Sequence, residues 1–130
     1  MPARSSFDYA VIRVVPRVER GEYMNAGVIL YCRMLDFLDA RIALDRRRLA
    51  AFAPELDLDE VERALALFPL VCHGDPAAGP IAQLDASERF RWLVAPRSTI
   101  AQTSAVHSGL CTDPDQALEH LLETMVRPRP

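Results

Sequence analysis

"YMNAGVILYC", residues 23–32, is the segment from which the fold of this chain can best be inferred. Residues 28–31 are apolar at consecutive positions, so an extended segment here has no polar face. Such a strand is typical of the middle of a sheet that is covered on both sides. Gly27 lies inside the strand and predicts a β-bulge or the close approach of another backbone.

Two further strands are predicted on either side of this segment. "DYAVIRVV" (8–15) is rich in β-branched residues and ends before Pro16. "FLDARIAL" (37–44) alternates apolar and polar residues, which is typical of a strand with one exposed face. Because the connections are short, the three strands are expected to form an antiparallel meander.

The pattern changes to helical spacing after residue 44. Helices are predicted over 45–53, 56–68 and 87–94, and Pro69 is expected to end or kink the second of them. A fourth strand is predicted at 99–103, and Asp113 is placed to cap a last helix that carries an apolar stripe. The order β-β-β-α-α-α-β-α favours an α+β domain. We expect an antiparallel sheet of about four strands with helices on one face, a two-layer sandwich.

Composition limits the classes of function. The 130 residues predict a single domain, with residues 1–6 and 127–130 as frayed tails. A net charge of −3 makes nucleic acid an unlikely main ligand. All 15 cationic side chains are arginine, which excludes a Schiff-base lysine and a phosphate-loop lysine.

Targeting signals and cofactor motifs are not found in the sequence. No apolar run reaches the roughly 18 residues of a membrane span, and the first residues lack the apolar core of a signal peptide. We therefore expect a cytoplasmic protein without a membrane segment. The 3 cysteines and 3 histidines show no metal-ligand spacing, and no glycine-rich phosphate loop is present. No cofactor and no metal are expected.

The densest cluster of hydrogen-bonding side chains is "RSTIAQTSAVHSG", residues 97–109, called the polar strip below. The guanidinium of Arg97 suits phosphate or carboxylate. Because alternate residues of an extended segment share a face, the chain must bend within 104–109 for Arg97, Gln102 and His107 to converge. We predict an anion or small-ligand site here; the alternative is an edge strand with a wet outer face. The candidate ligand-binding residues are Arg97, Ser98, Thr99, Gln102, Ser104 and His107.

"RGEYMNAG", residues 20–27, is the second candidate segment. Asn25 is an amide within an apolar strand, and a buried amide needs a specific partner. In the functional interpretation, Glu22 and Asn25 meet the polar strip from across the sheet, with Glu22 paired to Arg97. The alternative is a turn followed by one structural hydrogen bond.

Catalytic arrangements have weaker support. There is no G-x-S-x-G elbow, and the adjacent Cys72 and His73 are expected to point apart. If the chain is an enzyme, His107 is the candidate acid or base, with Arg97 as a clamp for a phosphate ester or an amide. "RRR" (46–48) is a basic patch that would contact an acidic partner or a phosphate backbone, or form a solvated face.

Two blocks resemble the domain-of-unknown-function 3037 family of bacterial proteins. They are "YAVIRVVPRVERGEYMNAGVIL" (9–30) and "APRSTIAQTSAVHSGLCTDPDQALEHL" (95–121), in the order and at the ends expected for the family. The resemblance implies a small, single-domain, cytoplasmic protein. It also implies a HipA-like kinase as a partner, because members are often encoded beside one. It implies no activity and no catalytic residues.

Three hypotheses for the function follow from these observations. The first is a non-catalytic binding or accessory module that recognises an anionic group or a partner protein such as a HipA-like kinase. The second is a small enzyme that acts on a phosphate ester or an amide through Arg97 and His107. The third is a structural subunit of a hetero-oligomer, which would expose a large apolar patch.

Overall fold

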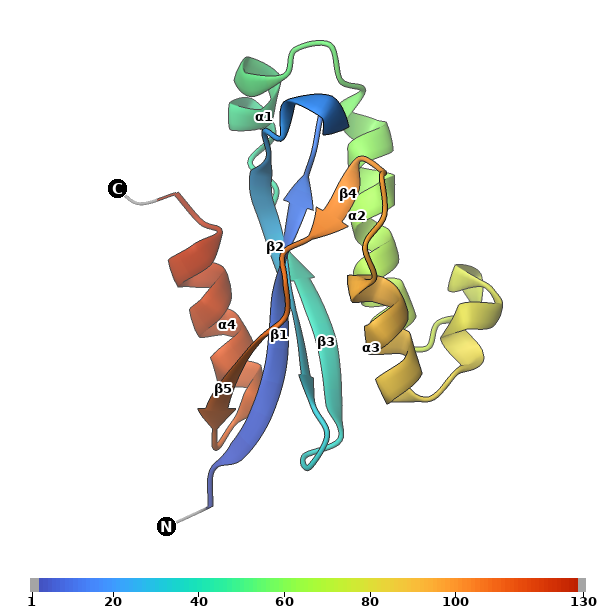
Figure 1. Ribbon diagram of the computed structural model, residues 1–130, viewed down its shortest axis with the longest axis vertical. Helices are drawn as coiled ribbons and strands as arrows, with labels where there is room; N and C mark the ends of the chain where they lie inside the picture. The colour runs from blue at the N-terminus through green and yellow to red at the C-terminus, as the bar shows by residue number, and fades with distance from the viewer. Residues whose placement is uncertain (1–2, 129–130) are drawn as a thin grey trace.

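The computed structural model describes residues 3–128 and contains a five-stranded antiparallel sheet (Figure 1). The predicted meander is confirmed, because β1 pairs with β2 and β2 pairs with β3. On its other side β1 pairs with both β4 and β5, which follow one another along its length. The strands are β1 (Ser5–Val14), β2 (Met24–Cys32), β3 (Phe37–Ile42), β4 (Ala101–Thr103) and β5 (His107–Cys111).

Each of the four α-helices begins after an aspartate whose carboxylate accepts backbone N–H groups of the first turn. This is the usual way in which a helix start satisfies its free donors. The helices are α1 (Arg46–Phe52), α2 (Leu58–Cys72), α3 (Ala86–Val94) and α4 (Pro114–Met125), capped by Asp45, Asp57, Asp85 and Asp113. Short 3₁₀ turns lie at Val18–Arg20, Pro76–Ala78 and Pro80–Gln83.

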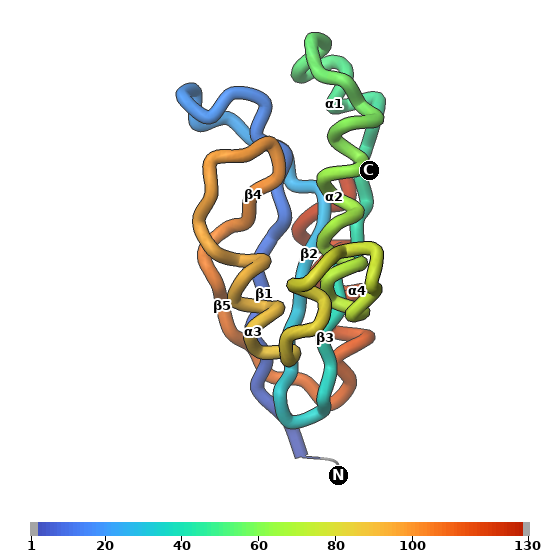
Figure 2. The backbone as a smooth tube through the Cα atoms, turned by 90° about the vertical axis from the view of Figure 1, so that its right-hand side faces the viewer, coloured from blue at the N-terminus to red at the C-terminus, as the bar shows by residue number. Residues whose placement is uncertain are grey.

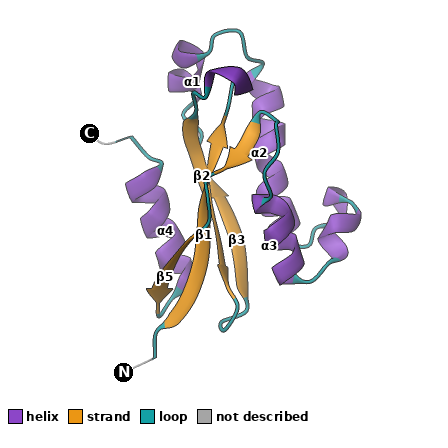
Figure 3. Ribbon diagram, viewed as in Figure 1, coloured by secondary structure: helices purple, strands orange, loops and turns teal. Residues whose placement is uncertain are grey.

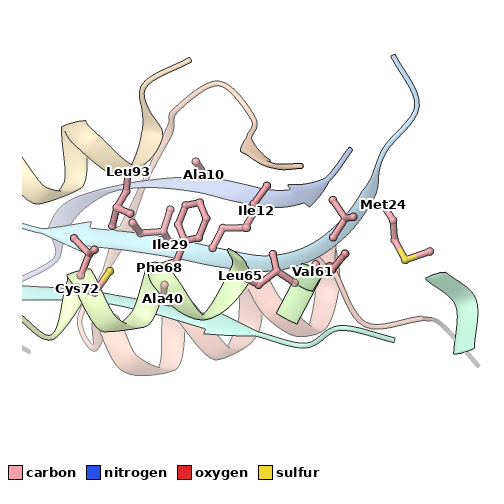
Figure 4. Close-up of a cluster of buried hydrophobic side chains, with 14 of the residues drawn as sticks. Ala10, Ile12, Met24, Ile29, Ala40, Val61, Leu65, Phe68, Cys72 and Leu93 are labelled. Atoms are coloured by element: carbon pink, nitrogen blue, oxygen red, sulfur yellow. The ribbon is translucent and has the colours of Figure 1, made fainter. Parts of the chain in front are cut away.

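The α+β class is confirmed, but the layers differ from the predicted two. Helices α1, α2 and α3 contribute to a core on one face of the sheet, where Figure 4 shows Phe68 of α2 beside Ile29 of β2. Helix α4 packs on the opposite face, against Val11, Val28 and Leu30. Figure 3 shows α4 on one side of the sheet and α2 and α3 on the other. The sheet is therefore the middle of three layers.

β2 has the central, covered position that its sequence predicts. Ile29 faces the first core, Leu30 faces the second, and both are fully buried. Gly27 meets both expectations for a strand glycine. The β1–β2 register shifts beside it, and a Cβ atom at this position would lie 2.6 Å from the carbonyl oxygen of Arg41.

Three details of the sequence prediction are corrected. Of the two expectations for Pro69, the helix end is wrong: α2 runs through Pro69 to Cys72, and burial of Val71 and Cys72 in the core compensates for the backbone donor that proline lacks. β5 is a fifth strand where only a bend was expected. Of the predicted frayed tails, residues 5–6 belong to β1, and residues 1–2 and 129–130 lie outside the described residues. Across residues 3–128, no helix has the length and apolar character needed to cross a bilayer.

Replacing Gly27 by alanine is expected to destabilise the protein by about 1–3 kcal/mol, since the added methyl group meets a backbone oxygen that cannot move without distorting β3. Gly109→Ala is the matched control. Its methyl group would meet the far end of the buried Phe7 ring, and a small change in a side-chain torsion relieves that contact more readily than a backbone oxygen can shift, so the loss should be smaller. Urea unfolding of both variants measures the difference, and equal losses would contradict the close-approach explanation.

Candidate functional site

The polar strip forms the free edge of the sheet: it leaves α3, pairs as β4, bends, and pairs again as β5. Arg97, Gln102 and Ser104 line a shallow hollow of about 220 Å³ beside the end of α3. His107, Ser98 and Thr99 are not part of its lining. The structure therefore brings together three of the six predicted residues of the strip.

Arg97 is bound to the end of α3. Its guanidinium donates to the carbonyl oxygen of Trp92 and, at 3.5 Å, to that of Ala95. It also stacks over the Trp92 ring, 4.7 Å from the centroid. A cation at this position satisfies the free carbonyls and the negative dipole of a helix C-terminus. Arg97 is thus engaged with its own chain.

The side chains that follow Arg97 are also bonded to backbone. Gln102 donates to the carbonyl oxygen of Thr99 at 2.8 Å, and Thr99 donates to that of Ala101 at 2.8 Å. Thr103 faces α3 and donates to the carbonyl oxygen of Val94 at 3.4 Å. The first two bonds are local to residues 99–102, and the third holds β4 to the end of α3. They leave few donors directed toward a ligand.

Ser104 is buried and completes the pairing of β1 where β4 ends. Its hydroxyl accepts the backbone N–H of Val11 at 2.9 Å and donates to the carbonyl oxygen of Ala105 at 2.9 Å. Its own backbone N–H donates to the carbonyl oxygen of Val11 at 2.8 Å. The hydroxyl of Ser104 therefore accepts the N–H of Val11 where neither β4 nor β5 supplies a backbone carbonyl.

The remaining candidates of the strip lie on its exposed part. The ring of His107 packs against Tyr9, with 5.6 Å between the centroids, and Ser108 donates to the carboxylate of Asp8 at 2.8 Å. Ser98 is exposed in the loop before β4. His107 is therefore separated from the hollow that contains Arg97, and the predicted convergence of the two residues is not formed.

Glu22 and Asn25 lie apart from the polar strip. Glu22 forms its ion pair with Arg20, so the predicted pair with Arg97 is absent. Asn25 of β2 is paired with Arg13 of β1, and Arg13 is paired on its other side with Gln102 of β4. Asn25 and Gln102 thus share a face of the sheet but are separated by two strand spacings, about 10 Å. The amide of Asn25 donates instead to the carbonyl oxygen of Met125 at 3.0 Å.

A groove with about three times the volume of the hollow, roughly 660 Å³, lies around Asn25. It is bounded by the start of β2, by α1 and by the end of α4, segments that are distant in the sequence. Three of its large apolar side chains are exposed: Tyr23, Phe52 and Met125. The complete lining is Tyr23, Met24, Asn25, Arg48, Ala51, Phe52, Met125 and Val126.

The charge at the groove is positive. Arg48 lies in the lining, and among the residues described no acidic side chain does. Arg46, two residues earlier, pairs with Glu62 at 2.5 Å and with Asp59 at 3.6 Å, whereas the ion pairs within residues 3–128 leave Arg48 without a carboxylate. The guanidinium of Arg13 stacks on the ring of Tyr23, 4.0 Å from the centroid, and so adds a second cation next to a residue of the groove lining.

Two buried polar atoms, Oδ1 of Asn25 and Nε of Arg13, have no hydrogen-bond partner among residues 3–128. One is an acceptor and the other a donor, and they belong to facing residues of β1 and β2. Unpaired buried polar atoms are rare because each costs about 1–3 kcal/mol. The facing residues Arg13 and Asn25 therefore place polar atoms in the sheet next to the apolar side chains of the groove.

The comparisons with known proteins define the family. Residues 9–126 match the family described as "Protein of unknown function (DUF3037)". The chain belongs to the DUF3037 family. No curated protein and no solved structure matches the chain. The description of DUF3037 assigns no activity, so the chemistry of this member must come from its own residues.

A nucleophilic cysteine is not supported in this DUF3037 protein. Cys72 lies in the core, where burial raises the pKa of its thiol and the nearby Asp39 carboxylate raises that pKa further. The ring of the neighbouring His73 lies 2.7 Å from the carboxylate of Asp39, which is its hydrogen-bond partner. Within residues 3–128 there is also no group of three or more histidine, cysteine, aspartate or glutamate side chains placed to hold a metal ion.

The sequence did not identify Tyr23, Phe52 and Met125 as site residues. Each lies at or beside the end of a helix or strand. An apolar residue at such a position is predicted to belong to the buried face of that element. The one signal in the sequence was the arginine run at 46–48, and the structure shows that its last member, Arg48, lines the groove. The three-dimensional arrangement of α1, β2 and α4 was needed to join these residues.

All three cysteines of the native protein are expected to react slowly with a thiol reagent at pH 8. Cys32, Cys72 and Cys111 are buried, and burial raises the pKa of both the Cys72 and the Cys111 thiols, so little thiolate is present. The same assay in denaturant, where all three should react at once, is the control. A fast-reacting thiol in the folded protein would contradict this description.

Proposed function

We propose that this protein is a non-catalytic binding module, and that its ligand carries an apolar group next to an anion. The observation that supports this most is the groove around Asn25, in which Arg48 has no carboxylate partner among residues 3–128 and stands beside exposed apolar side chains. Its volume of about 660 Å³ is in the usual range of ligand sites.

The chemistry of the lining selects the ligand class. Phe52 and Met125 offer apolar surface, and burying it on binding contributes about 25 cal/mol for each Å². Arg48 offers a planar fork of donors that suits a carboxylate or a phosphate. Because no cysteine, serine, histidine or acidic side chain of residues 3–128 lines the groove, it supports binding better than bond cleavage.

A segment of a partner protein fits this description. An exposed stretch with an aromatic or aliphatic side chain next to an aspartate or glutamate would supply both groups. The HipA-like kinase that the family resemblance implies is one such partner to test. The bonds of the polar strip favour a structural role for Arg97, Gln102 and Ser104, in place of the predicted anion site.

Phenylacetate tests the proposal, with phenylacetamide as a neutral control of the same shape. At about ten times its Kd a ligand adds about 1.4 kcal/mol of stability, which corresponds to a shift of a few degrees in Tm. We expect phenylacetate to raise the Tm more than phenylacetamide. The difference should vanish in Arg48→Gln and persist in Arg97→Gln.

Two outcomes would contradict the proposal. Equal shifts with both compounds, or no shift with either, would show that the groove does not recognise an anion. A difference that vanishes in Arg97→Gln and persists in Arg48→Gln would place the site at the polar strip, as first predicted from the sequence. Circular dichroism of both variants checks that they are folded.

A further inference from the structure

The two edges of the sheet differ in charge. β3 forms one edge and carries Asp39 and Arg41. Arg41 pairs with Asp115 and, at 3.1 Å, with Glu119 of α4, while Asp39 contacts His73 at the end of α2. Charged groups on an edge strand are a common means of preventing it from pairing with another strand.

The other edge has no such protection. Residues 98–112, which include β4 and β5, contain no aspartate, glutamate or arginine. In Figure 2, β5 lies at the left margin of the molecule, and no described segment lies outside it. Alternate residues of an antiparallel strand direct their N–H and C=O groups to either side, so β5 presents unpaired backbone groups to solvent.

Apolar side chains are exposed along the same edge. Leu110 in β5 is 62% exposed, and Val106, directly before β5, is 43% exposed. Leu110 stands opposite Ser6 of β1, so no core residue covers it from the neighbouring strand. An exposed, uncharged edge with apolar side chains is a surface that favours addition of a strand.

We propose that β5 pairs with β5 of a second copy of this chain, antiparallel about a two-fold axis. In an isologous contact each residue meets the same surface on its partner, so a charged edge would bring like charges together. Residues 98–112 contain no carboxylate or guanidinium to repel the copy, and the neighbouring Asp8 carboxylate is one strand further in, on β1, where it accepts the hydroxyl of Ser108. The contact would join two five-stranded sheets into one and cover Leu110 on both copies.

This interface is independent of the proposed groove. The groove is lined by β2, α1 and α4, and none of its residues lies in 98–112. Ligand binding and self-association can therefore be tested separately. Failure of one leaves the other standing.

Size-exclusion chromatography with light scattering tests the proposal. We expect twice the chain mass of 14.5 kDa at high protein concentration, with dissociation on dilution. Leu110→Lys should weaken the dimer at least about tenfold, because it places a charge on the edge. Met34→Lys is the matched control: Met34 is 79% exposed at the β2–β3 turn, and this variant should dimerise like the wild type.

A cross-link identifies the edge directly. The native cysteines are buried, so Leu110→Cys adds an exposed thiol, which should form an intermolecular disulfide under mild oxidation with diamide. Met34→Cys should cross-link far less. A species of 14.5 kDa at every concentration would overturn the proposal. So would a dimer that persists in a folded Leu110→Lys variant.

Discussion

The pairing of β1 with two separate strands on one side is the constraint on which the rest of the structure depends. β4 pairs with residues 12–14 and β5 with residues 5–9, so Val11 stands at the gap between them. Ser104 closes the gap, since its hydroxyl accepts the N–H of Val11 and its backbone N–H donates to the carbonyl of the same residue. Without this bond a buried donor of the central strand would be unpaired.

The consequences extend to the helices. With β4 held by Ser104, Thr103 reaches the end of α3, and Arg97 binds the last carbonyls of that helix. β5 leads into α4, and α4 covers the second face of the sheet. The hydrogen-bonding side chains of the polar strip thus connect the end of α3 to the edge of the sheet. The groove, by contrast, is apolar and basic and lies where the strip does not reach.

The elements that follow from local physics could be predicted from the sequence. β1, β2 and β3 show β-branched or alternating patterns, and the four helices show capping aspartates and apolar stripes. β5 could not be found, because "HSGLC" has no apolar alternation and becomes a strand only by pairing with β1. The second helical layer was implied by β2, which is apolar on both faces and so requires cover on both. A two-layer arrangement did not satisfy that requirement.

The candidate site shows the same limit. The sequence identified Asn25 as an amide that needs a partner, and the structure supplies the carbonyl of Met125, one hundred residues later. Polar density pointed to Arg97, although backbone carbonyls already engage its donors. Counting polar side chains cannot separate groups that satisfy the fold from groups that are free for a ligand. The groove is formed only when β2, α1 and α4, which are distant in the sequence, bring Tyr23, Arg48 and Met125 together.

The most direct test of this account is the unfolding free energy of Ser104→Ala, measured by urea denaturation together with hydrogen exchange of the Val11 amide. The variant should lose about 1–3 kcal/mol, because the buried N–H of Val11 loses its acceptor. The amide should also exchange faster. Ser98→Ala, which removes an exposed hydroxyl from the same strip, should leave both quantities unchanged. Wild-type stability and unchanged exchange in Ser104→Ala would contradict the structural role assigned to the polar strip.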